Sequence, residues 1–188
     1  MVVPLAKIAG CRVIGIAGGS AKCKFVTEVL GADIAVDYRE EQFEQRLREA
    51  SPNGIDIYFD NVGGKLLDIC VGQIALRGRV VMCGRISEYV EGPISGLVNY
   101  YRIGEQNARM EGFFIYDYAD RFGDAEAELA KWFRAGLLPV AEDMLVGLER
   151  MPEALIRLYE RDNTGKQVVR IATLDSAHDQ FTFPEEGR

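Results

Sequence analysis

The sequence is poor in metal-binding residues, and it has neither an excess of basic charge nor a long apolar run. It contains one histidine and four cysteines, and no C-x-x-C pair is found among Cys11, Cys23, Cys70 and Cys83. A zinc site needs clustered Cys or His ligands, so we expect no metal site, and we expect the cysteines to be buried, reduced thiols. The formal net charge of -7 at pH 7 disfavours a nucleic-acid partner or an anionic membrane surface, because both require a basic field.

Signals for export or membrane insertion are also lacking. No apolar stretch approaches the roughly 18 to 20 residues that span a bilayer. The first residues, from Met1 to Lys7, do not form a basic leader followed by an apolar run. We therefore expect a cytoplasmic protein with no membrane partner, long enough at 188 residues to bury the core of one domain.

Short apolar runs alternate with helical segments over most of the chain. Strands are predicted at 11–17, 32–38, 55–59, 78–82 and 110–116, and helices at 3–9, 21–30, 40–50, 65–76, 98–108 and 119–135. Ser20 is expected to cap the second helix. This alternation predicts an α/β fold, a doubly wound parallel sheet of the Rossmann type with helices on both faces.

The pattern changes after Pro139. A strand or loop at 140–146, a helix at 152–159 that begins with proline, and a strand at 167–172 are predicted, followed by a polar tail. We therefore divide the chain into a partial dinucleotide-binding domain at 1–138, a C-terminal segment at 139–173 and a tail at 174–188.

Two turns carry the clearest functional signal. Asp60-Asn61-Val62-Gly63-Gly64 follows one predicted strand, and Cys83-Gly84-Arg85-Ile86-Ser87-Glu88-Tyr89 follows the next. Ligands of open parallel sheets bind beyond the carboxyl ends of strands, and glycine lets the backbone approach them closely. The paired glycines have no evident packing role in the sequence. Two such turns on successive strands indicate a nucleotide crevice.

The turn after the first visible strand points to the kind of nucleotide. Gly18-Gly19-Ser20 is followed by Lys22 and Lys24, with no acidic residue in the loop. Basic residues beside a helix N-terminus accommodate a 2′-phosphate, so the pattern favours NADP(H) over NAD(H); the alternative is a solvated surface lysine. Tyr38 ends the second strand, near the adenine or ribose or as a packing residue. Tyr89 either reaches a ribose or substrate carbonyl or is a surface tyrosine.

One expected element is missing. A dinucleotide-binding domain opens with a strand and a G-x-G-x-x-G loop whose backbone N–H groups hold the pyrophosphate. Nothing before Cys11 matches this pattern, and Gly15-Ile16-Ala17-Gly18-Gly19 has the wrong spacing and position. The predicted sheet therefore lacks its first strand and glycine loop.

Four motifs together resemble the zinc-free medium-chain dehydrogenases/reductases. They are Asp60 to Gly64, Cys83 to Tyr89, Met110-Glu111-Gly112-Phe113 and Asn163-Thr164-Gly165-Lys166. The resemblance runs from about Lys7 to Ile171 and is to the leukotriene B4 12-hydroxydehydrogenase / prostaglandin reductase group, which includes NADPH-dependent curcumin and alkenal double-bond reductases. It implies NADPH-dependent reduction of the C=C bond of α,β-unsaturated aldehydes and ketones.

The resemblance also implies roles for individual residues along the cofactor. Tyr89 is the implied catalytic residue, near the nicotinamide ribose, where it aids handling of the enolate. The implied cofactor contacts are Lys22 and Tyr38 at the 2′-phosphate end, Asn61 and Cys83 in the groove, Phe113 and Phe114 through their backbone at the carboxamide, and Asn163 closing over the cofactor.

The chain departs from this group in one large respect. Members carry a barrel-like catalytic domain upstream, to which their C-terminal stretch returns. Without the first Rossmann strand, its two neighbours would lie about two strand spacings apart, roughly 10 Å. Either the sheet closes up, a partner fills the gap, or the chain is a piece of a longer protein.

We therefore expect the cofactor-binding portion of an enone reductase, inactive as an isolated chain. Two alternatives remain open: a non-catalytic Rossmann remnant that binds a partner or self-associates, and a quinone reductase of the same superfamily. If the strand at 110–116 lies at a sheet edge, it could pair across a homodimer.

Overall fold

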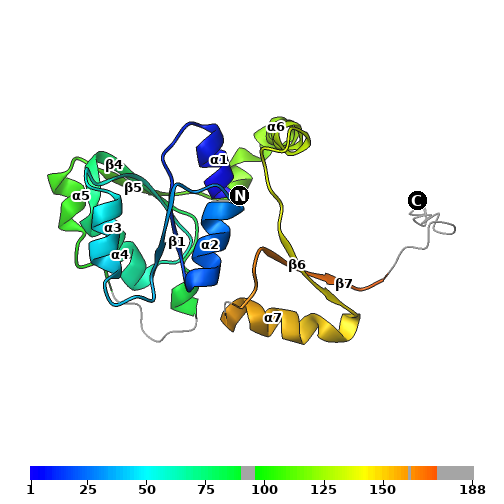
Figure 1. Cartoon of the computed structure of the whole chain (residues 1–188). Coiled ribbons are helices and arrows are strands. Elements are labelled where there is room, and N and C mark those ends of the chain that lie inside the picture. Colours follow the sequence, from blue (N-terminus) through cyan, green and yellow to red (C-terminus); the bar gives the residue numbers. More distant parts are fainter. Residues whose placement is uncertain (90–95, 161, 173–188) are drawn as a thin grey trace, which may run out of the picture. The chain divides into compact units, whose positions relative to one another are not determined.

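The computed structural model describes residues 1–89, 96–160 and 162–172, which fall into two compact units, Met1–Pro139 and Val140–Arg188. The first unit alternates helices and strands (Figure 1). Its elements are α1 (Val2–Ile8), β1 (Ile14–Ala17), α2 (Ser20–Glu28), β2 (Ile34–Asp37), α3 (Phe43–Ala50), β3 (Ile55–Asp60), α4 (Gly64–Gly72), β4 (Ile74–Met82), η1 (Ile86–Tyr89), α5 (Tyr101–Glu105), β5 (Arg109–Gly112), η2 (Ile115–Arg121) and α6 (Phe122–Arg134).

The strands of the first unit form two parallel sheets. β1 pairs with β2, and β3, β4 and β5 pair in that order. The predicted Rossmann-like α/β fold is confirmed. Within the described ranges no ladder joins β1 to β3, so the sheet has not closed up where the first strand was expected.

The core of this unit lies where α3 and α4 pack on the strands. Phe43 and Leu47 are one helical turn apart on α3, and Cys70 and Val71 of α4 are fully buried with them. The burial of Cys70 raises its pKa to about 12, so this thiol stays protonated. The expectation of buried thiols is wrong for Cys11 and Cys83, which lie in loops and are exposed.

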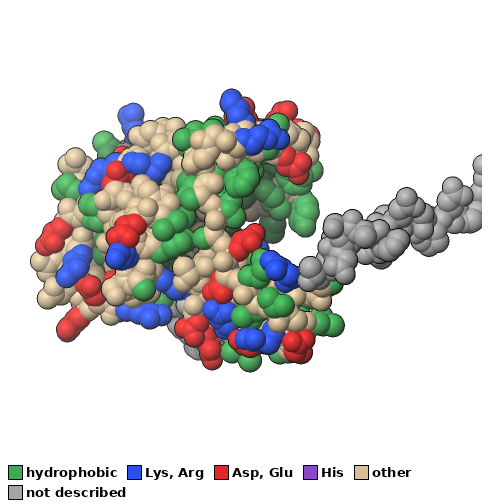
Figure 2. Space-filling model, turned by 45° about the vertical axis from the view of Figure 1, so that its right-hand side comes forward, with side chains coloured by type: hydrophobic (Ala, Val, Ile, Leu, Met, Phe, Trp, Pro, Cys, Tyr) green, Lys and Arg blue, Asp and Glu red, His purple; other side chains and the backbone are tan. Residues whose placement is uncertain are grey.

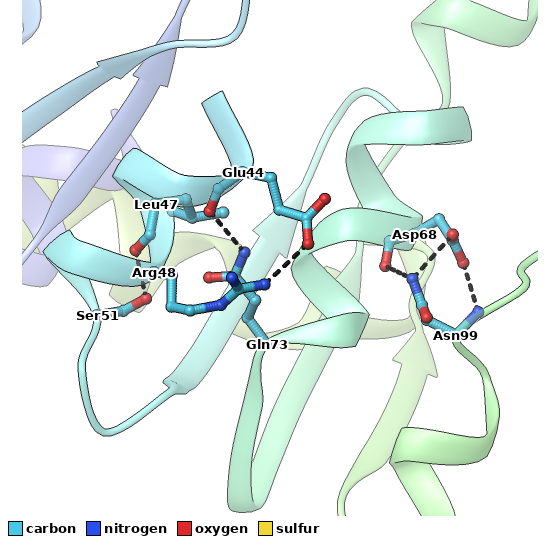
Figure 3. A network of polar contacts seen from close by, with 7 residues as sticks. All are labelled: Glu44, Leu47, Arg48, Ser51, Asp68, Gln73 and Asn99. Atoms are coloured by element: carbon cyan, nitrogen blue, oxygen red, sulfur yellow. Dashed lines mark hydrogen bonds and ion pairs between the residues drawn. The ribbon is translucent and has the colours of Figure 1, made fainter. Parts of the chain in front are cut away.

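Polar contacts fix the helices around this core (Figure 3). The side-chain amide of Gln73 donates to the Glu44 carbonyl at 3.1 Å, which ties the end of α4 to α3. The carboxylate of Asp68 accepts hydrogen bonds from the backbone N–H groups of Val98 and Asn99, both at 2.8 Å. The segment before α5 is thereby held against α4.

Several predicted boundaries are wrong. The helix predicted at 65–76 ends at Gly72, because Ile74 pairs with Ile55 and is buried in β4. The strand predicted at 110–116 ends at Gly112, and a short 3₁₀ helix follows. Ser20 is the first residue of α2 and makes no side-chain cap, so it is not the predicted cap.

The second unit contains β6 (Glu142–Val146), η3 (Leu148–Arg150), α7 (Met151–Glu160) and β7 (Lys166–Arg170). β6 and β7 pair in parallel, so the segment left open as strand or loop is a strand. Asp143 joins the elements: its carboxylate binds Arg157 at 2.8 Å and accepts from the Thr164 N–H at 3.0 Å. The predicted tail at 174–188 lies outside the described residues.

Charged side chains of both signs are mixed with apolar ones over the face seen in Figure 2. In the second unit the apolar side chains of Leu148, Leu155, Ile156 and Tyr159 are more than half exposed. None of the helices within the described ranges is long and apolar enough to cross a membrane.

Candidate functional site

Three of the predicted cofactor residues follow the ends of three adjacent strands. Asp60 pairs with Met82, and Met82 pairs with Gly112, so β3, β4 and β5 end in register. The next residues along the chain are Asn61, Cys83 and Phe113, which we call the strand-end row. Because neighbouring strands lie about 4.8 Å apart, the structure brings these three positions together at one edge of the sheet.

Backbone hydrogen bonds join the two turns that carry this row. The N–H groups of Cys83 and Gly84 donate to the Asp60 carbonyl at 2.8 and 3.1 Å. Ser87 donates to the Val62 carbonyl through its N–H at 3.0 Å and through its hydroxyl at 2.6 Å. The two turns therefore form one connected surface at the carboxyl ends of the strands.

The side chain of Asp60 is the internal support of this surface. It is 1% exposed and accepts hydrogen bonds from the Tyr58 hydroxyl at 3.0 Å and from the N–H groups of Val62 and Gly63. Burial raises the pKa of Tyr58, so its hydroxyl remains a donor. Asp60 holds the turn, while Asn61 is exposed and available to a ligand. Tyr58, two residues earlier on the same strand face, is the signal that could have predicted this.

The paired glycines have a packing role that was not evident in the sequence. Gly63 has a φ of 73°, and a methyl group there would lie 3.0 Å from the Cβ of Arg85. Glycine is thus needed at Gly63 by the close contact between the two turns.

Tyr89 ends η1 in the second of these turns. Its side chain is 64% exposed, and the Arg85 guanidinium lies 5.7 Å from its ring centroid. The tyrosine therefore lies at the end of the second turn, with its ring exposed to solvent. Its catalytic role stays a prediction.

The two phenylalanines after β5 have different surroundings. The ring of Phe113 packs against the rings of Phe59 and Tyr118, with 6.4 Å and 6.3 Å between the ring centroids. Phe114, in contrast, is 76% exposed. The side chain of Phe113 therefore packs at the carboxyl ends of the strands, which is compatible with the expected contacts to the carboxamide because those contacts involve the backbone of Phe113 and Phe114.

A second group of predicted residues surrounds the turn after β1. A methyl group at Gly18 would lie 2.8 Å from both the Tyr38 hydroxyl and the Nε of Arg39. Lys22 is the third residue of α2, which begins directly after this turn. We call Lys22, Tyr38 and Arg39 the basic corner. Arg39 was missed in the sequence, although it directly follows Tyr38.

An acidic residue, Asp37, also contacts this corner. The loop after β1 contains no acidic residue itself, so the sequence of the loop did not predict this contact. One carboxylate oxygen of Asp37 accepts from the Gly19 N–H at 2.9 Å, and the other accepts from the Arg39 N–H at 2.9 Å. These bonds, first the one from Gly19, lower the pKa of Asp37. Both oxygens are engaged by backbone donors, so Asp37 orders the turn.

Asn163 belongs to the second unit. Its side-chain amide donates to the Gly165 carbonyl at 2.9 Å, which fits a turn before β7. Its closure over a cofactor stays a prediction.

The described residues contain no group of three or more His, Cys, Asp and Glu side chains that could hold a metal ion. His178 lies outside the part of the chain that the structure describes.

Comparisons with protein families, with individual proteins and with solved structures give matches that agree with one another. Residues 1–132 match the family model for zinc-binding dehydrogenases. The NADPH-dependent curcumin reductase of Escherichia coli K12 is 36% identical over 89% of this chain and 50% of that protein. The NADP(+)-dependent 2-alkenal reductase of Nicotiana tabacum is 38% identical over 92% of this chain and 50% of that protein.

Among solved structures, CurA from Vibrio vulnificus in complex with NADPH is 38% identical, with a TM-score of 0.84 over 92% of this chain and 53% of that one. A quinone oxidoreductase of Pseudomonas syringae pv. Tomato DC3000 is 25% identical, with a TM-score of 0.75. The chain thus spans about half the length of the relatives it matches.

Proposed function

The chain belongs to the zinc-binding dehydrogenase family, and we propose that it forms the cofactor-binding part of an NADPH-dependent oxidoreductase. The reaction is reduction of the C=C bond of α,β-unsaturated aldehydes and ketones. The observation that carries the proposal is the strand-end row, in which paired strand ends align Asn61, Cys83 and Phe113 at the carboxyl edge of a parallel sheet.

The residues present fit a phosphorylated dinucleotide. The basic corner offers Lys22 and Arg39 beside the N-terminus of α2, where partial positive charge also favours a phosphate. The bound cofactor supplies the hydride. In this proposal the chain's residues hold and orient it: Lys22 and Tyr38 at the adenosine 2′-phosphate, Asn61 and Cys83 in the groove, the backbone of Phe113 and Phe114 at the carboxamide, and Asn163 over the cofactor.

Tyr89 is the proposed catalytic residue. Its exposed hydroxyl at the end of η1 would donate a hydrogen bond to the substrate carbonyl oxygen, where negative charge develops as the enolate forms. No zinc role is assigned, because the described residues supply no cluster of ligands for one.

The comparisons support an enone over a quinone as substrate. The curcumin and alkenal reductases are 36% and 38% identical to this chain, against 25% for the quinone oxidoreductase. The alternative of a non-catalytic remnant that binds a partner gives no reason for a preference for NADPH over NADH, so such a preference in the binding test below would favour the oxidoreductase.

The C-terminal segment 139–173 is proposed to pack on a catalytic domain, with 174–188 as a tail. The exposed apolar side chains of Leu155, Ile156 and Tyr159 support such a contact. Among the strands that the structure describes, β5 lies at the edge of its sheet, which supports the proposal of a homodimer paired through it. A cytoplasmic location stays a prediction.

Replacing Lys22 with alanine is expected to remove a preference for NADPH over NADH. The parent chain should bind NADPH more tightly because only NADPH carries the 2′-phosphate. Loss of a charge-assisted contact to that phosphate should weaken NADPH binding about tenfold or more and leave NADH binding unchanged. Cofactor fluorescence during titration measures both affinities.

The matched control is Lys24→Ala, which removes the same charge from the same helix. Lys24 is exposed and lies 3.8 Å from Glu28, one turn further along. The Lys24→Ala variant should leave the affinities for NADPH and for NADH unchanged. Equal, weak binding of NADPH and NADH by the parent chain would count against the cofactor assignment.

The isolated 188-residue chain is expected to show little or no NADPH oxidation with a simple enone. The sequence has no G-x-G-x-x-G loop, and β1 and β3 are not joined, so the pyrophosphate lacks its usual backbone donors. Absorbance of NADPH at its nicotinamide band measures turnover. Robust turnover by this chain would contradict the expectation.

A further inference from the structure

A second polar site lies away from the strand-end row. A pocket of about 550 Å³ in the first unit is lined by Arg77, Arg79, Asn107 and Arg109. Arg79 precedes the carboxyl end of β4 by three residues, and Arg109 is the first residue of β5. Arg79 and Arg109 each lie four residues before a member of the row, Cys83 or Phe113, so at about 3.3 Å per residue the pocket lies roughly 13 Å from the row, toward the amino ends of the strands.

Strand register forces two of these arginines together. Arg79 and Arg109 are direct partners across the β4–β5 ladder. Like charges placed directly opposite each other destabilise a sheet. Among the described residues no recorded ion pair neutralises either of them, whereas Arg46 and Arg48 on α3 each pair with a glutamate. Glu111, two residues after Arg109 on the same strand face, has no recorded ion pair with them.

The third arginine is held there by an unusual backbone conformation. Between two pairings with β3, at Ile74 and Arg79, β4 advances five residues while β3 advances two, so β4 bulges outward. Arg77 lies in this bulge with a φ of 60°, and its N–H donates to the Gln106 carbonyl at 2.7 Å. The left-handed region disfavours a non-glycine residue, and bulges of this kind often re-aim side chains at binding sites.

We propose that this arginine pocket binds the phosphate group of a small phosphorylated ligand, at a site separate from the cofactor. Guanidinium groups match phosphate oxygens in pairs, and a dianion would relieve the repulsion between Arg79 and Arg109. The net charge of -7 of the whole chain favours a small molecule over a nucleic acid, which needs a broad basic surface.

The test is a titration of the full chain with inorganic phosphate and with pyrophosphate, at constant ionic strength maintained with chloride. Amide chemical shifts in the NMR spectrum report where each anion binds. We expect saturable shifts around Arg77 to Arg79 and around Arg109. The double substitution Arg79→Gln and Arg109→Gln should weaken the affinity about tenfold or more.

The control is Arg46→Gln with Arg48→Gln, which removes the same charge from α3 and should leave the affinity unchanged. If the double variant of the pocket does not fold, Arg109→Gln alone should still weaken binding severalfold. The proposal is overturned by the absence of saturable shifts in the parent chain, by equal weakening in pocket and control variants, or by shifts confined to the basic corner.

Discussion

Asp60→Leu is expected to lower the free energy of unfolding of the first unit by on the order of 4 kcal/mol. The carboxylate of Asp60 is buried and accepts from the Tyr58 hydroxyl and from the N–H groups of Val62 and Gly63. Leucine has the same branched arrangement of side-chain heavy atoms but no acceptor, so three donors would lose their partner. Each buried donor left unsatisfied costs about 1 to 3 kcal/mol. Urea unfolding followed by circular dichroism measures the loss.

Two variants separate this structural role from ligand binding. Tyr58→Phe removes one donor and should cost about 1.5 to 3 kcal/mol. Asn61→Ala changes an exposed side chain and should stay within about 0.5 kcal/mol of the parent while weakening cofactor binding. A loss below about 1 kcal/mol in Asp60→Leu would contradict the assignment of Asp60 as the support of the turn.

Gly63→Ala should cost about 2 to 4 kcal/mol, the second large effect on stability. The φ of 73° at Gly63 disfavours any residue with a Cβ atom. The added methyl group would also lie 3.0 Å from the Cβ of Arg85 and 3.2 Å from its Cα, so the two turns would have to separate. Unfolding in urea gives the cost, and weaker NADPH binding should accompany it.

The neighbouring glycine is the matched control. Gly64 also has a positive φ, of 57°, but the atom nearest to an added methyl group is the Ser87 hydroxyl oxygen at 3.0 Å, the end of a side chain that needs to shift by only a few tenths of an ångström, without leaving its bond to the Val62 carbonyl. Gly64→Ala should therefore cost only about 1 to 2 kcal/mol, from the backbone conformation alone. Equal losses in both variants would show that the contact with Arg85 has no energetic consequence.

The absence of hydrogen-bonded pairing between β1 and β3 among the described strands affects whether this chain can bind cofactor and whether it can catalyse turnover. The strand-end row and the basic corner lie at the carboxyl ends of separate ladders, one formed by β3 to β5 and the other by β1 and β2. A dinucleotide reaches from an adenosine end to a nicotinamide end, so both parts would have to act together. We therefore expect this chain to show a measurable preference for NADPH over NADH in binding, although it shows little or no turnover.

The fold class and the turns that carry the candidate site could be predicted from local patterns in the amino-acid sequence. Apolar runs such as 55–59 followed by Asp60 to Gly64 are local patterns, since a strand and the turn after it are encoded by neighbouring residues. The parallel order of strands then places the ends of β3, β4 and β5 at one edge. Asn61 and Cys83 could be placed at that edge from the predicted strands alone, whereas Phe113 was implied only by the family resemblance, because the predicted strand at 110–116 ran past it.

Which side chains are buried supports of the candidate site and which are exposed became clear from the folded structure. Ile74 looked helical but is in a strand, because it pairs with Ile55, nineteen positions earlier in the chain. Asp60 became a buried acceptor, and Arg39 came to lie over Gly18. The strand register of Ile74 and the contact of Arg39 with Gly18 depend on residues far apart in the sequence, so no local pattern predicts them, whereas Tyr58 is a local signal for the role of Asp60.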